Sequence, residues 1–336
     1  MFSFLISVLK IFFVLGFLVF IHEGGHFLAA RLFKVKVEEF SIGFGPKLFR
    51  KKGKETEYSI SVIPFGGYVR MLGEEQRVEE DRAFNKAKIW HRIIIVAAGA
   101  LVNIMFAIII YFMLSLFSGQ NVSTTVSNII PEYAENISGI EVGDKILEIN
   151  NSKIRIKSDI LKALRNSNGE KVKILVERSG KQLEFEVLPT EYAENVYILG
   201  IEVALENGTF KDKCYYAFWE TVDFVLSIGN SLKMLFSGKI SADQMTGPIG
   251  ISQIVVKTSG VYDFVYLLSL ISLSLGITNL LPIPALDGGR IVLLIIEGIR
   301  GKALSEEVEL GIQSIGFSLL ILLSLYVSYN DILRIF

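Results

Sequence analysis

The chain has 336 residues, 51% of them hydrophobic, and a mean hydropathy of +0.47, which is too apolar for an ordinary soluble protein of this length. Its formal net charge of −1 argues against a nucleic-acid partner, which would call for a basic face. The single cysteine, Cys214, excludes both an internal disulfide framework and a zinc site built from cysteines.

Four stretches are long and apolar enough to cross a bilayer, which takes about 20 residues. They run approximately over residues 2–32, 93–117, 264–281 and 310–333. The first stretch could be a secretory signal peptide, but Lys10 interrupts its apolar run and no small-residue cleavage site follows. Basic residues gather between the first two stretches and after the third, so the positive-inside rule places both loops in the cytoplasm. The segment 118–262 and both termini would then lie on the other side.

Three ionisable residues, His22, Glu23 and His26, lie inside the first apolar stretch. Helix positions four apart share one face, so both imidazoles can reach one ion with Glu23 beside them. This H-E-x-x-H spacing is typical of zinc peptidases, in which the glutamate takes a proton from metal-bound water. A polar contact between helices, or a proton path in a transporter, is the alternative. Gly24 and Gly25 would leave room beside the metal for another backbone, such as that of a substrate.

Residues 38–70 are predicted to form strands rather than a helix. Segments 37–42 and 57–62 alternate partly between apolar and polar residues, and glycines and Pro46 mark turns between them. We expect a hairpin or small sheet at the membrane face, with the second strand ending at residues 64–67. Such backbone is tolerated at bilayer depth only if protein buries it or a cavity solvates it. A hairpin in the cytoplasmic solvent is the alternative.

The segment after the second span changes character. Residues 121–190 have the composition of a soluble domain, with strands expected at 172–176 and 183–187 and a short amphipathic helix at 156–166. Residues 212–237 combine many aromatic side chains with scattered charges, which favours an amphipathic helix at the membrane interface. A fifth transmembrane span is the competing interpretation.

A third metal-ligand candidate, Asp287, lies far downstream, where two prolines and two glycines interrupt an apolar region over residues 279–290. A carboxylate is costly in a membrane unless it is paired, and a divalent cation is a strong partner. Catalytic zinc takes three protein ligands and keeps one open position, so Asp287 would complete the set. We expect Zn²⁺, although another first-row metal would fit the same donors. His91 lies at a basic membrane edge and is expected to be an interface residue rather than a ligand.

Hydrolysis within a bilayer would also require water and a locally unwound substrate. Residues 40–68 and 282–289 are expected to be non-helical and could line a wet cavity, with strand edges that pair with the substrate. The candidate substrate contacts are Gly66, Gly67, Asn103 and Asn279. For Asn103, an ordinary hydrogen bond between helices is the alternative.

With these motifs the chain resembles the site-2 protease family of intramembrane zinc metalloproteases, in the bacterial branch typified by the regulator of sigma E protease. Residues 22–26 match its H-E-x-x-H, and residues 279–288 match its N-x-x-P-x-P-x-L-D-G. Residues 64–69 resemble the P-x-G-G-Y-V that follows the family's membrane-reentrant β-loop, and residues 246–250 resemble its G-P-I-G motif.

The resemblance implies that His22, His26 and Asp287 bind zinc, that Glu23 is the catalytic acid and base, and that Asn279 contacts substrate. Ala100 stands where the family's second span usually has a proline, so a kink in that helix is not implied.

Residues 139–150 are similar to the G-L-x-x-G-D-x-I-x-x-I-N pattern of PDZ domains, with a plain β-rich spacer as the alternative. The expected fold is a polytopic α-helical membrane protein of about four transmembrane helices, with a membrane-associated β-hairpin and an inserted α+β PDZ domain. Its parts would be an N-terminal membrane half (1–120), the PDZ domain (121–190), a region with the interfacial helix (191–260) and a C-terminal membrane half (261–336).

By the same resemblance, the substrates would be transmembrane segments of single-pass proteins of the anti-sigma-factor type, or remnant signal peptides. The bacterial inner membrane would house the enzyme, with the active site toward the cytoplasm. The PDZ domain would lie on the opposite side and bind peptides or filter substrate ectodomains by size. Two rivals stay open: a membrane zincin of the CAAX-processing type, whose third ligand is a glutamate, and a non-enzymatic transporter or PDZ scaffold.

Overall fold

The computed structural model describes residues 2–74, 76–117, 121–137, 139–193, 196–206, 209–238 and 246–335. The chain divides into two compact units. The membrane unit comprises Met1–Ile110 with Ile228–Phe336, and the inserted unit is Tyr111–Ser227.

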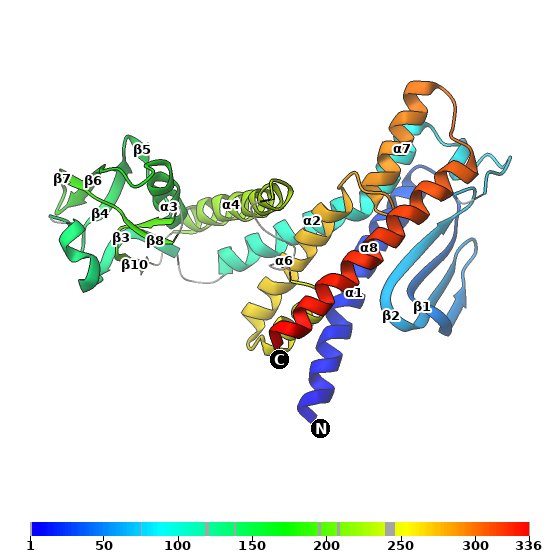
Figure 1. Ribbon diagram of the computed structural model, residues 1–336, viewed down its shortest axis with the longest axis horizontal. Coiled ribbons are helices and arrows are strands. Elements are labelled where there is room, and N and C mark those ends of the chain that lie inside the picture. Colours follow the sequence, from blue (N-terminus) through cyan, green and yellow to red (C-terminus); the bar gives the residue numbers. More distant parts are fainter. Residues whose placement is uncertain are drawn as a thin grey trace. The chain divides into compact units, whose positions relative to one another are not determined.

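Four helices within the described residues are long and apolar enough to cross a bilayer, as predicted. They are α1 (Phe2–Leu32), α2 (Ile89–Phe117), α6 (Val261–Asn279) and α8 (Glu306–Ile335), labelled in Figure 1. Helix α6 stops at Asn279 because Pro282 and Pro284, just beyond it, lack the N–H groups that would continue the hydrogen-bond ladder. Many apolar side chains of α8 are exposed in the chain itself, including Leu319 and Leu322. Such a surface suits lipid rather than water.

The β-hairpin of the membrane unit consists of β1 (Val37–Lys52) and β2 (Glu57–Met71), which pair antiparallel. Phe40 of β1 pairs with both Tyr58 and Val69, so the first half of β1 lies between two stretches of β2. The prediction that residues 64–67 end the second strand is wrong. Strand β2 continues through them to Met71, because register irregularities absorb the distortion that the glycines and the proline introduce.

A buried apolar cluster packs this hairpin against helices α1, α2 and α7 (Asp287–Arg300). It joins Ala30 of α1, Phe40 and Val69 of the hairpin, Ile95 of α2 and Leu294 of α7. The position of β2 relative to α1 is therefore set by core packing.

Helix α5 (Pro248–Lys257) shows what the G-P-I-G motif does in this chain. The carboxylate of Asp331, on α8, is buried and accepts hydrogen bonds from the N–H groups of Gly247 (3.1 Å) and Gly250 (2.8 Å). It therefore caps the α5 N-terminus, whose free N–H groups need acceptors. A side chain at Gly247 would collide with that carboxylate, and one at Gly250 would collide with Thr246.

The inserted unit is built on a six-stranded sheet. Its order is β10 (Ile201–Glu206), β3 (Asn121–Ile129), β4 (Lys145–Ile149), β6 (Val172–Arg178) and β7 (Lys181–Val187), with β5 (Ser152–Lys153) beside β4. Helix α3 (Lys157–Asn166) shares a buried core with the sheet, centred on Ile146, Leu164 and Ile174. Because β10 pairs with β3, residues 201–206 belong to the same sheet as residues 121–129.

The remaining elements are short, apart from one helix. They are η1 (Phe84–Lys86), η2 (Pro131–Ile137), the paired strands β8 (Thr190–Ala193) and β9 (Val196–Ile198), and helix α4 (Phe210–Phe236). Helix α4 covers the segment for which an amphipathic helix was expected, and it is not among the candidate spans found within the described ranges.

A buried ion pair ties the loop before β4 to β6. The fully buried Asp144 accepts hydrogen bonds from Arg178 at 2.6 Å and 2.7 Å, and from the N–H of Glu141 at 2.9 Å. The Arg178 guanidinium holds the pKa of the Asp144 carboxyl below its ordinary value, although burial works in the opposite direction. A lowered pKa in the folded state means that the ionised carboxylate stabilises the fold above the unfolded pKa, and that this stabilisation is lost as the pH falls through the folded pKa.

We expect Asp144→Asn to destabilise the inserted unit by about 2 kcal/mol at neutral pH, because it removes a charge-assisted pair from a buried site. The difference from wild type should begin to shrink as the pH falls below about 4, where the unfolded carboxyl takes up its proton. It should vanish once the pH has passed the lowered pKa of the folded carboxyl. Hydrogen exchange of the β4 and β6 amides in the full-length protein would measure this. Glu184→Gln is a matched control, since its pair with Lys173 is exposed and should contribute at most about 0.5 kcal/mol.

Candidate metal centre

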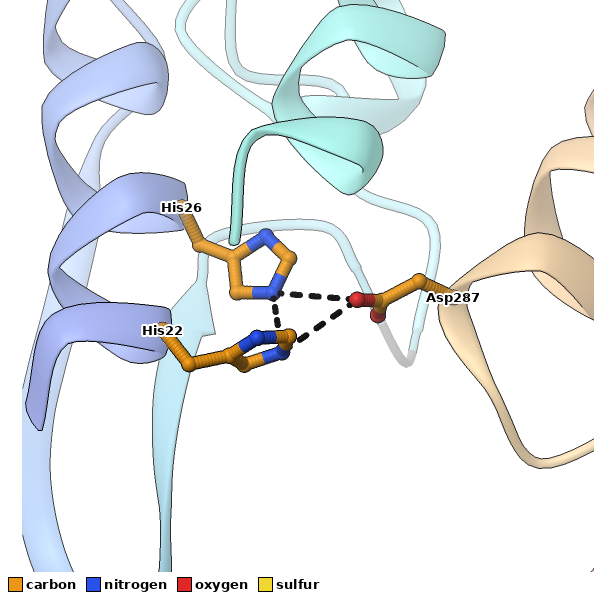
Figure 2. A group of neighbouring side chains, drawn as sticks. All are labelled: His22, His26 and Asp287. Carbon is orange, nitrogen blue, oxygen red and sulfur yellow. Dashed lines mark hydrogen bonds and ion pairs between the residues drawn. The ribbon is translucent and has the colours of Figure 1, made fainter. Parts of the chain in front are cut away.

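Two imidazoles and one carboxylate converge between α1 and α7 (Figure 2). The Nε2 atoms of His22 and His26, one helical turn apart on α1, lie 3.2 Å from each other. Oδ2 of Asp287, the first residue of α7, lies 3.2 Å from the Nε2 of His22 and 3.6 Å from that of His26. The three ligand-type atoms are all within 4.8 Å of one another, so the three residues selected from the sequence form one cluster.

Close approach of α1 and α2 places His26. A side chain at Gly25 would strike the Ala98 carbonyl of α2, and one at Gly99 would overlap the His26 ring. The backbone beside Gly25 is therefore that of α2 and not that of a substrate, whereas Gly24 faces open space. Glycine at both helix surfaces is what brings the His26 ring against α2.

The hydrogen bond at Nδ1 of His26 determines how this ring presents its other nitrogen. Nδ1 lies 2.8 Å from the carbonyl oxygen of Ile95. A carbonyl can only accept, so Nδ1 carries a proton, and in the neutral ring Nε2 then presents its lone pair toward Asp287. An imidazole lone pair and a carboxylate oxygen facing each other at 3.6 Å repel unless a proton or a metal cation lies between them.

The second imidazole has an amide partner. Nδ1 of His22 lies 3.4 Å from the side-chain amide of Asn103, whose Oδ1 is buried and has no partner among the described groups. With the amide turned so that its oxygen and nitrogen exchange places, Oδ1 accepts the Nδ1 proton. Nε2 of His22 is then also a lone-pair donor aimed at the same point.

The residues fit a zinc ion. Oδ2 of Asp287 is buried and makes no hydrogen bond to any group in the described part of the chain. A buried, unsatisfied carboxylate oxygen facing two imidazole lone pairs is costly in a bare protein. Two histidine nitrogens and one carboxylate oxygen form a common catalytic donor set for zinc.

The turn before α7 places Asp287. Pro282 and Pro284 interrupt the helical backbone, and Ala285 takes a left-handed conformation with φ of 73°. A side chain at Gly288 or Gly289 would collide with carbonyl oxygens of the preceding turn. The P-x-P-x-L-D-G-G pattern thus produces a tight reversal that starts a new helix at the carboxylate.

A cavity of about 800 Å³ opens on this cluster. Glu23 lines it and is half-buried, and a side chain at Gly67 of β2 would touch the Glu23 methylene chain. The stretch of β2 from Gly67 to Met71 forms one wall. Arg290 and Glu74, which also line the cavity, form a 2.5 Å ion pair.

The other residues predicted from the sequence to belong to the site are Gly66 and Asn279, and His91 is the expected non-ligand. Gly66 has φ of 107° and packs under the Phe44 ring, and neither it nor Asn279 is among the described residues that line the cavity. Asn279 is half-buried at the end of α6. His91 stacks on Phe33 with ring centroids 4.2 Å apart, which is consistent with its prediction as a non-ligand.

Sequence reasoning missed several supporting groups. Gly99, the Ile95 carbonyl and Glu74, the partner of Arg290, had no local pattern that marked them. Arg290 could have been found from its place three residues after Asp287, which puts both side chains on one face of α7.

Comparison with known proteins relates the whole chain to zinc peptidases. The family description "Peptidase family M50" matches residues 10–323. A candidate zinc metalloprotease of Clostridium acetobutylicum is 37% identical over 94% of each chain. The regulator of sigma-W protease RasP of Bacillus subtilis is 30% identical over 98% of this chain and 99% of its own length. A zinc metalloprotease RasP of Geobacillus kaustophilus is 29% identical over 98% of both chains.

Proposed function

The chain belongs to peptidase family M50 and is an intramembrane zinc metalloprotease, and from this premise we propose that His22, His26 and Asp287 hold its zinc ion, with Glu23 as general acid and base. Family membership rules out the two rivals, a CAAX-type zincin and a non-enzymatic transporter or scaffold. The observation that carries the proposal is the convergence of two imidazole nitrogens on a buried carboxylate oxygen that has no hydrogen-bond partner among the described residues.

The residues around the cluster divide the chemistry between them. When bound, Zn²⁺ acts as a Lewis acid that polarises the scissile carbonyl and raises the acidity of the attacking water. Glu23 lines the same cavity as the three ligands, so its carboxylate can accept the water proton and return it to the leaving amine. We propose that Asn103 orients the His22 ring and that Ile95 orients His26, so that both rings keep Nε2 toward the metal.

An extended substrate would lie along β2. The stretch from Gly67 to Met71 pairs with β1 and also lines the cavity, so an unwound peptide can add to the sheet next to Glu23. Gly67 lets β2 lie close to α1 beside Glu23, because a side chain there would collide with the Ser41 carbonyl and with Val19. Gly66 would support this wall through its backbone conformation, and Asn279 would contact a more distant part of the substrate.

The protein is a multi-pass membrane protein, and the surface of the hairpin supports its placement in the membrane. Phe44, Leu48 and Phe49 of β1 and Ile60 and Ile63 of β2 are each more than two-fifths exposed. Lipid would cover these side chains, whereas a hairpin in water would leave them hydrated. We propose that the enzyme resides in a bacterial inner membrane with the basic residues 31–92 on the cytoplasmic side, and with the inserted unit on the other side.

The substrates we propose are transmembrane segments of single-pass proteins of the anti-sigma-factor type, or remnant signal peptides. The name of the Bacillus subtilis relative, a regulator of sigma-W protease, supports the first class. We further propose that the inserted unit is a PDZ domain that filters substrates by the size of their ectodomains or binds their peptide ends.

Cleavage of a synthetic single-pass peptide by the purified full-length protein in lipid nanodiscs tests this function. We expect product masses that place the cut inside the apolar segment or at its edge. Removing residues 121–206, which span the sheet from β3 to β10, should allow cleavage of a substrate with a bulky ectodomain while short substrates are still cut. Cuts confined to soluble flanking residues would contradict the intramembrane assignment, and unchanged discrimination after the deletion would contradict the filter.

A further inference from the structure

The last membrane helix, α8, contacts the segment that leads into Asp287 at two points one turn apart. Oε1 of Gln313 accepts a 2.5 Å hydrogen bond from the backbone N–H of Ala285. Three residues on, Gly316 is buried against Pro284, and any side chain at 316 would collide with that proline. The turn and α8 therefore meet through a close-packed surface with one polar contact.

The polar contact is made by Ala285, the residue of this turn that has a positive φ. Ala285 has φ of 73°, a conformation that is unfavourable for any residue with a Cβ. Such backbone persists when its surroundings hold it in place. The carboxylate of Asp287 follows two residues later, so a change in the Ala285 backbone would move Oδ2 away from the two imidazoles.

The side chain of Gln313 can stabilise this backbone conformation through its hydrogen bond to the Ala285 N–H. An amide side chain within a membrane-spanning helix is uncommon and usually has a specific partner. The Ala285 N–H can only donate, so the orientation of the Gln313 amide is determined: its oxygen faces Ala285. Its Nε2 is buried and has no partner among the residues the structure describes, so within these residues the side chain forms its hydrogen bond to Ala285.

We propose that Gln313 is a positioning residue for the metal centre: by holding the Ala285 N–H it stabilises the left-handed turn that delivers the Asp287 carboxylate to His22 and His26. This inference rests on the proposed role of Asp287 as a zinc ligand. It makes the docking of α8 a determinant of metal affinity, although α8 supplies none of the three ligands.

Gln313→Met tests the first half of this proposal. Methionine has a similar length but cannot accept the Ala285 proton, so the turn should relax and zinc should bind about tenfold more weakly, as outer-shell changes commonly cause. Zinc retained by the purified full-length protein is measured against increasing chelator, with the unfolding temperature as a check on folding. Ser318→Ala is the matched control, because Ser318 lies on the same helix and, among the residues that the structure describes, donates its hydroxyl proton to the Ser314 carbonyl of that helix.

Ala285→Gly tests whether the effect passes through the turn. Glycine adopts a positive φ without strain and does not need to be held. In the Gln313→Met/Ala285→Gly double variant, zinc affinity should return to within about twofold of Ala285→Gly alone. A double variant that stays as weak as Gln313→Met would overturn the proposal, because a methionine that merely disturbed α8 packing would not be rescued at residue 285.

Asp287→Ala in the same assay separates this inference from the function it rests on. Wild-type zinc retention by Asp287→Ala would refute the proposed ligand set itself. Loss of zinc from Asp287→Ala together with wild-type retention by Gln313→Met would overturn only the positioning role of Gln313.

Discussion

Asp287→Ala is expected to lower the affinity for zinc by more than about a hundredfold and to abolish peptide hydrolysis. Oδ2 of Asp287 lies 3.2 Å and 3.6 Å from the two imidazole nitrogens, so its removal leaves two ligands where a catalytic site needs three. Because loss of an outer-shell partner alone costs about 10- to 100-fold, loss of a ligand should cost more. Metal analysis of the purified protein, paired with the peptide-cleavage assay, measures both effects.

Asp263→Ala is the control for this prediction. Asp263 is also an aspartate in the first turn of a helix, α6, but its side chain is exposed and it is not a member of the metal cluster. The Asp263→Ala protein should keep its zinc and its activity. If Asp287→Ala instead bound zinc as wild type does, the carboxylate would be only a hydrogen-bond or ion-pair partner of the histidines.

Glu23→Gln is expected to keep zinc while reducing kcat by about 10²- to 10⁴-fold, the range that loss of a general acid–base group produces. Glutamine has the same shape, so the packing beside Gly67 should be preserved. It cannot take a proton from water at neutral pH, and the leaving amine then lacks its proton donor. Single-turnover cleavage and metal content would be measured on the same preparation.

The control is Glu79→Gln, at a carboxylate whose side chain is 93% exposed and which lies outside the cavity lining. It should leave both readouts unchanged. A Glu23→Gln protein that retained more than about a tenth of the wild-type kcat would show that another group moves the proton. If the Glu23→Gln protein lost zinc as well, Glu23 would be required for metal binding or for folding rather than for proton transfer alone.

The Asp287→Ala and Glu23→Gln proteins should differ in their zinc content. Loss of Asp287 should remove the metal and the chemistry together, whereas loss of Glu23 should remove the chemistry and leave the metal. This separation is expected because the ligand cluster is formed by His22, His26 and Asp287, while Glu23 lines the cavity without belonging to it.

Local patterns in the sequence were sufficient to predict the four membrane helices, the hairpin and the two histidines on one helix face. A run of about 20 apolar residues and a four-residue spacing on a helix are properties of neighbouring residues. Asp287 could also be selected, since a carboxylate that follows two prolines in an apolar region needs a charged partner.

Local patterns failed where the outcome depends on what packs against a residue. Residues 64–67 look like the end of a strand, but pairing with β1 carries β2 through them to Met71. Gly25 suggested room for a substrate, but it is occupied by the backbone of α2.

By itself, then, the sequence determined which side chains can bind a metal and which segments lie in lipid, because both follow from residue type and short-range spacing. Only the tertiary structure decided that the Ile95 carbonyl orients His26 and that Gln313 contacts Ala285. These partners are 69 and 28 residues apart in the chain, and the contacts form only when separate helices pack together. The physical reason is that hydrogen bonds between packed helices depend on the approach of two surfaces, and no short-range pattern specifies both.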